Sequence, residues 1–317
     1  MDDKQFEISY RSSADNTMQL ALFQPARSQE PRPLLVALHT WSCDHLTCSW
    51  ELYRKSCEEL DWHIIYPTFR GPNTRPEACG SELVIKDIVS ARNYVMENFN
   101  VDPDKIYLAG GSGGGHAALL TAGVHPELWT AVSAWCPITD IAAWHKECEN
   151  HCRVYHDHIE LVCQGDPQVS ESARADAFKR SPAAYLASAR GKTIIDISTG
   201  IHDGHTGSVP ISHAFRGFNL LCKESDRIDS SDIDYMVEKE LIPENLKYQG
   251  PAEETFKENP ILMRRVSDNV RITIFEGGHN ILPAAACAWL KNQTKPLQQD
   301  WQLCQAPAWS KAAELTH

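Results

Sequence analysis

The chain has 317 residues, an ordinary length for one α/β domain with insertions, and its 42% of hydrophobic residues suffice for a sizeable core. It contains 30 Lys and Arg against 42 Asp and Glu, which gives a formal net charge of −12. This acidic balance argues against nucleic acid and anionic membrane surfaces as partners, because both bind through a basic excess. No apolar run reaches the ~18 residues of a membrane-spanning helix.

The N-terminus and the cysteines bear on the cellular compartment. Residues 1–5 are polar and acidic, without the basic region and apolar run of a signal peptide, although a cleaved signal replaced by a methionine stays open. The 11 cysteines are an odd number, so at least one is unpaired in a monomer. We expect mostly reduced cysteines in a cytoplasmic protein, rather than the disulfides of a secreted one.

Apolar runs predict the strands, and amphipathic stretches predict the helices. The predicted strands cover residues 6–12, 18–24, 34–39, 63–66, 105–109, 131–135, 193–198 and 270–275. The predicted helices cover residues 49–60, 82–99, 116–122, 210–221 and 280–291. An N-terminal hairpin followed by alternating strands and helices predicts a mostly parallel sheet with helices on both faces. We expect a single domain over 1–317, with a core of about 30–292, insertions near 140–190 and 223–259, and a C-terminal tail.

The segment 108–116, LAGGSGGGH, joins a predicted buried strand to a predicted helix through a glycine turn with Ser112 at its apex. This is the Gly-x-Ser-x-Gly pattern of a nucleophile elbow. A phosphate-binding loop is disfavoured because the turn lacks the Gly-Lys-Ser/Thr ending. A dinucleotide-binding turn is disfavoured because the next strand offers no acidic residue for the ribose. The pattern therefore predicts a catalytic serine.

A serine nucleophile needs a general base and an acid that orients the base. His279 follows the last predicted core strand, and Asp203 follows the strand before it, so the order is serine, acid, histidine. Asp140, after the strand 131–135, is the competing acid. The oxyanion hole would use the N–H of Gly113 and a second N–H from the loop after strand 34–39, that of Trp41 or Thr40.

Other side chains near the predicted strand ends are candidates for secondary roles. Trp135 and Trp144, together with Trp41, could line a substrate enclosure, and His202 and His205 flank the predicted acid. Six metal-capable side chains gather in one predicted insertion: Cys148, His151, Cys152, His156, His158 and Cys163. They contain no Cys-x-x-Cys pair and fit no standard zinc-finger spacing, so we expect no metal and no cofactor.

These motifs together resemble the α/β-hydrolase superfamily and, within it, the catalytic domain of the prolyl oligopeptidase family. The segments that carry the resemblance are 66–72, 100–106, the elbow 110–115, 200–203 with Val209 and Pro210, and 277–279. The resemblance implies a serine hydrolase with the triad Ser112, Asp203 and His279. Two departures lie beside the site: the stretch 204–208 is longer than expected, and the region 215–262 is expanded.

The predicted substrate is a small carboxylic ester, with acylated carbohydrates as one class, cleaved through an acyl-enzyme. An ester needs less remote binding energy than a peptide because an alcohol leaves more easily than an amine. The family's peptidases usually grip peptides with a β-propeller, and about 30 residues before the core are too few for a ~40-residue blade. The alternative is a prolyl oligopeptidase-like peptidase acting on short peptides, and a less favoured one is a non-catalytic binding protein.

Overall fold

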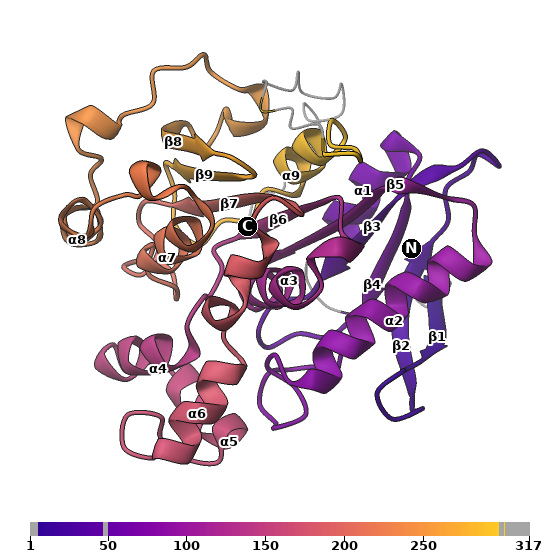
Figure 1. Ribbon diagram of the computed structural model, residues 1–317, viewed down its shortest axis with the longest axis horizontal. Coiled ribbons are helices and arrows are strands. Elements are labelled where there is room, and N and C mark those ends of the chain that lie inside the picture. Colours follow the sequence, from indigo (N-terminus) through magenta and orange to yellow (C-terminus); the bar gives the residue numbers. More distant parts are fainter. Residues whose placement is uncertain (1–5, 47–49, 298–300, 302–317) are drawn as a thin grey trace.

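The computed structural model describes residues 6–46, 50–297 and 301, and its centre is one nine-stranded sheet (Figure 1). The strand order is β1-β2-β4-β3-β5-β6-β7-β9-β8. The strands are β1 (Glu7–Arg11), β2 (Met18–Gln24), β3 (Arg32–Leu38), β4 (His63–Pro67), β5 (Val101–Gly111), β6 (Ala131–Trp135), β7 (Ile194–Gly200), β8 (Ile261–Ser267) and β9 (Val270–Phe275). The six central strands, β4, β3, β5, β6, β7 and β9, pair in parallel. Strands β1 and β2 at one edge and β8 at the other are antiparallel additions.

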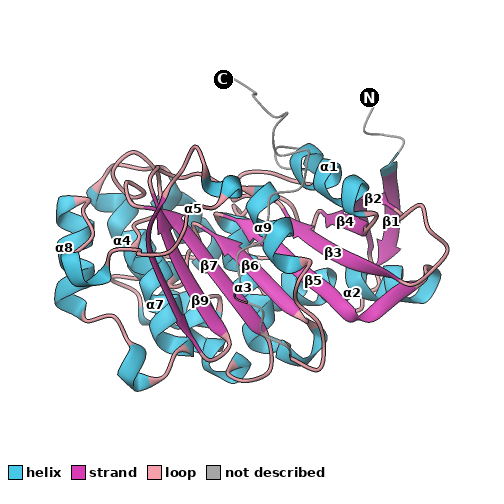
Figure 2. Cartoon of the chain, turned by 90° about the horizontal axis from the view of Figure 1, so that it is seen from above, coloured by secondary structure: helices cyan, strands magenta, loops and turns pink. Residues whose placement is uncertain are grey.

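Helices cover both faces of this sheet (Figure 2). The helices are α1 (Trp50–Leu60), α2 (Glu82–Asn98), α3 (Gly113–Val124), α4 (Ile141–Asn150), α5 (Tyr155–Cys163), α6 (Glu171–Lys179), α7 (Ser212–Leu221), α8 (Ser230–Lys239) and α9 (Pro283–Leu290). Alternate residues of β3 enter opposite layers: Leu34 and Val36 pack with α2, α3 and α7, whereas Leu35 packs with α1 and α9. A strand buried on both faces explains the continuous apolar run in the sequence.

The predicted fold class is confirmed, and most predicted elements lie within a few residues of their observed bounds. Two differences stand out. Strand β5 begins at Val101 rather than at residue 105, with an irregular register against β3 between Arg32 and Leu34. Strand β8 was not predicted, because its central Arg264 and Arg265 hide the strand pattern in a charged stretch.

The first predicted insertion, residues 140–190, forms the group α4, α5 and α6 with short 3₁₀ turns (Figure 1). These three helices share a buried apolar cluster with Trp41 from the loop after β3. The insertion is therefore packed directly against the loop that the sequence assigns to the oxyanion hole.

The second predicted insertion, residues 223–259, contains α8 and short 3₁₀ turns at the β8 end of the sheet. Met236 of α8 joins the core layer that contains α7. Phe256 packs on the opposite layer, with ring centroids 6.0 Å from both Trp135 and Phe275. The segment thus contributes to both core layers at this end of the sheet.

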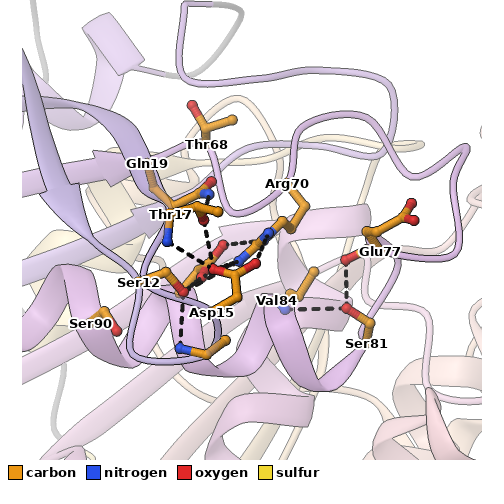
Figure 3. A network of polar contacts seen from close by, with 12 residues as sticks. Ser12, Asp15, Thr17, Gln19, Thr68, Arg70, Glu77, Ser81, Val84 and Ser90 are labelled. Carbon is orange, nitrogen blue, oxygen red and sulfur yellow. Dashed lines mark hydrogen bonds and ion pairs between the residues drawn. The ribbon is translucent and has the colours of Figure 1, made fainter.

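A polar network fixes the N-terminal hairpin to the body of the domain (Figure 3). Arg70, in the loop after β4, lies with Nε 2.6 Å from Asp87 Oδ2 and Nη1 2.9 Å from Asp15 Oδ2. Ser12 Oγ donates a short hydrogen bond to Asp87, and the Asp87 side chain is fully buried. Burial raises the pKa of Asp87 even though Arg70 and Ser12 oppose that rise. The buried carboxylate therefore depends on its charged partner.

Candidate active site

Ser112 lies at a sharp turn between β5 and α3, with φ 55° and ψ −121°. This positive φ is strained for a residue with a side chain, and it is the conformation expected of a nucleophile elbow. Close packing explains the neighbouring glycines: a Cβ at Gly110 would lie 2.5 Å from the backbone of Gly114, and one at Gly114 would lie 2.5 Å from Leu38 O. Ser112 N–H donates to Trp135 O at 2.8 Å, which ties the turn to β6.

The structure brings Asp203 and His279 together after β7 and β9, with His279 Nδ1 2.7 Å from Asp203 Oδ2. The other carboxylate oxygen, Oδ1, accepts the backbone N–H groups of Gly204 at 3.0 Å and Val209 at 3.1 Å. These bonds fix the carboxylate so that Oδ2 faces the imidazole. The long stretch 204–208 therefore forms a loop that returns Val209 to the carboxylate.

The loop that carries His279 packs against the elbow. A Cβ at Gly111 would lie 2.1 Å from Ile281 Cδ1, and Gly111 directly precedes Ser112. Strands β5, β7 and β9 run parallel, so Ser112, Asp203 and His279 all follow strands at the carboxyl edge of the sheet. Ligands and catalytic groups of open α/β sheets gather at that edge.

The predicted oxyanion loop lies beside the residue after the serine. A Cβ at Gly113 would be 2.6 Å from Trp41 N, so only glycine allows these two backbones to approach so closely. The side chain of His39 fixes the start of this loop, with Nδ1 2.9 Å from Thr40 O and Nε2 2.7 Å from Thr68 O. This proximity favours Trp41 over Thr40 as the second donor.

Cys136 is a neighbour of the Asp203–His279 pair that the sequence analysis did not select as a site residue. It follows β6 with φ 45°, and its Sγ lies 3.4 Å from Asn280 O. Ligand atoms of Cys136, Asp203 and His279 all lie within 4.8 Å of one another. Burial, reinforced by the negative charge of Asp203, raises the pKa of the Cys136 thiol and keeps it neutral. Cys136 follows β6, which lies in the sheet between β5, the strand before Ser112, and β7, the strand before Asp203. This position in the strand order is the feature of the sequence that could have identified it.

The structure does not support the expected aromatic enclosure by Trp135 and Trp144. Trp135 is 1% exposed, and its Nε1 donates to Ser133 Oγ at 2.9 Å within the core. Trp144 is 0% exposed, and its Nε1 donates to Ser208 O at 2.9 Å. Both side chains are structural because the sheet and the insertion bury them completely. Trp41, also buried, packs edge-on against Trp144 with ring centroids 4.7 Å apart.

Two other candidates from the sequence, Asp140 and His202, have defined contacts in the structure. Asp140, the competing acid, caps α4 by accepting the N–H of Ala143 at 3.0 Å, and it is Asp203 that lies against His279. His202 lies between two carboxylates, 2.6 Å from Glu240 and 2.7 Å from Glu276.

His205 and His158 hold structural contacts. His205 Nε2 lies 2.6 Å from Val237 O, which links the acid loop to α8. His158 Nδ1 accepts the Nε1–H of Trp41 at 3.3 Å. Of the six metal-capable side chains selected from the sequence, His158 thus serves as a hydrogen-bond acceptor for the oxyanion loop.

Comparison with known proteins agrees with this architecture. The sequence profile of the prolyl oligopeptidase family matches residues 81–234. The acylaminoacyl peptidase of Pyrococcus horikoshii, in its orthorhombic crystal form, has 12% identity and a TM-score of 0.63 over 93% of this chain and 42% of its own. A puromycin-hydrolyzing peptidase of Mycobacterium tuberculosis has 14% identity and a TM-score of 0.60 over 91% of this chain and 40% of its own. Prolyl oligopeptidase B of Galerina marginata has 16% identity and a TM-score of 0.54 over 68% and 31%.

The fold and the profile match define an α/β-hydrolase and indicate a serine hydrolase. Within that class, the chain resembles the catalytic domain of the prolyl oligopeptidase family. It spans less than half the length of each of these three structures. Among the described residues, no helix has both the length and the apolar character needed to cross a bilayer.

Proposed function

We propose that Ser112, His279 and Asp203 form a catalytic triad that cleaves amide bonds of short peptides through an acyl-enzyme intermediate. The observation that carries the proposal is the contact between His279 Nδ1 and Asp203 Oδ2, which are 2.7 Å apart. This pair lies at the same sheet edge as Ser112, a serine in a strained turn. A base that is oriented by a buried acid is what a serine nucleophile requires.

In this proposal each group has one role. Asp203 Oδ2 accepts the Nδ1–H of His279, which leaves Nε2 unprotonated and able to take the proton of Ser112. Ser112 Oγ then attacks the carbonyl carbon, and the backbone N–H groups of Gly113 and Trp41 stabilise the oxyanion, helped by the positive end of α3. Protonated His279 donates to the leaving amine. Water then hydrolyses the acyl-enzyme by the same base catalysis.

Two considerations favour peptides over esters as substrates. The profile that matches is that of a peptidase family, and the neighbours are named as peptidases. The ester prediction also loses one of its arguments, since Trp135 and Trp144 are buried and do not offer their rings to a compact acyl or sugar group.

A fluorophosphonate probe tests the nucleophile. We expect it to label Ser112, and Ser112→Ala to abolish labelling and lower kcat on the order of 10⁶-fold. Ser225→Ala, at an exposed serine outside the site, serves as the matched control and should keep full labelling. Turnover that survives in Ser112→Ala would overturn the triad, and a wild-type protein that is neither labelled nor active would favour a non-catalytic binding protein.

A side-by-side assay decides the substrate class. We expect kcat/KM for proline- or alanine-linked dipeptide amides to exceed that for acetylated sugars of similar size. Simple aryl esters serve as a reference for the intact acyl-enzyme chemistry, since their leaving groups need little assistance. If acetylated sugars are turned over with the higher kcat/KM, the peptidase assignment is wrong and the esterase alternative stands.

A further inference from the structure

We propose that the helical insertion carries a zinc site, made by His145 of α4 together with His156 and Glu160 of α5. The site lies outside the candidate triad and does not depend on the proposed peptidase activity. It uses a histidine that sequence spacing did not select, His145, in place of the cysteines that the spacing emphasised.

The three side chains already converge on one point. Ligand atoms of His145, His156 and Glu160 all lie within 4.8 Å of one another. Glu160 Oε1 lies 3.0 Å from His145 Nε2 and 3.9 Å from His156 Nδ1. Bonds of about 2.0–2.2 Å in a tetrahedral zinc site place neighbouring ligand atoms roughly 3.3 Å apart. The separations seen here bracket that value, so an ion requires only small side-chain adjustments.

Helix geometry explains the convergence. His156 and Glu160 are four residues apart on α5, so they project from the same face of the helix. Helix α4 packs against α5 and presents His145 to that face, with the His145 and His156 rings 6.1 Å apart and almost perpendicular. Two side chains on one helix and one on its neighbour would let an ion link the two helices.

Unsatisfied imidazole nitrogens provide a second observation. The His145 side chain is 0% exposed, and within the described part of the chain its Nδ1 has no hydrogen-bond acceptor. Asp166 Oδ1 lies 3.6 Å from that Nδ1, slightly beyond hydrogen-bond distance. The buried Nδ1 of His156 also has no hydrogen-bond partner among the described residues; its nearest carboxylate oxygens are Asp157 Oδ1 at 3.4 Å and Glu160 Oε1 at 3.9 Å. An ion bound by His145 Nε2 and His156 Nδ1 would use one of these orphaned nitrogens directly.

The same ion would give the other orphaned nitrogen a role. Zinc-binding histidines usually donate their second ring N–H to a carboxylate, which fixes the tautomer and the ring orientation. Asp166 is placed to accept the Nδ1–H of His145 after a small movement. Two imidazoles and one carboxylate suit zinc and disfavour calcium and magnesium, which prefer all-oxygen sites. Three protein ligands leave a fourth position for water.

The position of the site indicates what an ion would stabilise. The connection between α4 and α5 contains Arg153, whose guanidinium donates to Gly204 O at 2.6 Å and to Ser208 O at 3.0 Å. Both carbonyls belong to the loop that follows Asp203. An ion that fixes α4 to α5 would therefore also hold the arginine that braces the acid loop.

Zinc titration of the metal-depleted protein tests the site, with calorimetry and thermal unfolding as readouts. We expect one high-affinity equivalent and a rise in Tm in the wild type. His156→Ala and the isosteric Glu160→Gln should each weaken binding at least 10-fold and remove most of the rise. Asp166→Asn should weaken it roughly 10-fold to 100-fold, as loss of a carboxylate behind a ligating histidine does. His151→Ala, at an exposed histidine of the same insertion, is the matched control and should bind like the wild type.

Cys136, Asp203 and His279 form a second metal-capable set, so each outcome must identify the site that is occupied. Zinc there would compete with the Asp203–His279 pair and would survive in His156→Ala and Glu160→Gln. Unchanged affinity and Tm shift in those two variants would therefore overturn the proposal, as would the absence of tight binding in the wild type. Circular dichroism of the metal-free Glu160→Gln variant confirms that lost binding reflects a lost ligand and not a lost fold.

Discussion

Replacing Asp203 by Asn tests the orientation of the base without changing the size of the side chain. Asp203 Oδ1 accepts two backbone N–H groups, from Gly204 and Val209, while Oδ2 accepts from His279. An amide that keeps its oxygen toward the two backbone donors must point its NH₂ group at His279 Nδ1. The imidazole then has to accept at Nδ1 and carry its proton on Nε2, where it cannot take the proton of Ser112.

The size of the effect follows from this wrong tautomer. Asp-to-Asn replacement in a serine triad costs about 10⁴-fold in kcat, which corresponds to about 5.5 kcal/mol at 1.36 kcal/mol per tenfold. KM should change little, because the hydrogen bonds to Gly204 and Val209 are retained. The free energy of unfolding should also change little for the same reason.

The assay measures kcat and the rate of fluorophosphonate labelling for Asp203→Asn beside Asp140→Asn. Asp140 is the matched control because it was the competing acid in the sequence, and Asn is an equally good helix cap for α4. We expect activity to fall only for the Asp203 variant. A loss below tenfold in Asp203→Asn, or a large loss in Asp140→Asn, would refute the assignment of the acid.

Two further predictions concern stability. Arg70→Ala should lower the free energy of unfolding by about 3–5 kcal/mol, because it leaves the fully buried carboxylate of Asp87 without its ion-pair partner; a loss below about 1 kcal/mol in urea unfolding would contradict this. Although burial lowers the pKa of His202, hydrogen bonds to Glu240 and Glu276 outweigh it and raise the pKa above its ordinary value. The stabilisation from His202 is therefore complete below the unfolded pKa of about 6.5 and is lost as pH rises through the raised folded pKa. His202→Gln should accordingly destabilise the protein at pH 6 and have less effect at pH 9, and equal destabilisation at both pH values in thermal unfolding would argue against this ion-pair arrangement.

The local pattern of apolar residues in the sequence was enough to predict the strands that are themselves apolar, such as β3, β6 and β9. It failed for β8, where the side chain of Arg264 is buried against residues of the preceding segment. The guanidinium of Arg264 forms a short ion pair with Glu253 and lies 5.6 Å from the ring of Phe256. Because both partners come from the segment before the strand, the strand pattern is visible only once that segment is folded.

The candidate site likewise has residues that the sequence predicts and residues that only the fold brings together. Ser112, Asp203 and His279 follow from strand order, since parallel strands bring their carboxyl ends to one edge. Cys136 was missed because its closeness to Asp203 and His279 depends on the fold rather than on any motif. The zinc candidate was missed because His145 of α4 meets His156 and Glu160 of α5 only through helix packing, which cysteine and histidine spacing along the chain does not describe.

Both insertions converge on the acid loop, which bears on where selectivity can arise. From the first insertion, Arg153 donates to the carbonyls of Gly204 and Ser208. From the second, the backbone carbonyl of Val237 lies 2.6 Å from His205 Nε2. The loop that orients the proposed catalytic carboxylate is thus held between the two insertions. Changes in either insertion can then alter kcat through the position of Asp203 while leaving every triad residue intact, and the two contacts can be removed separately to show which insertion dominates.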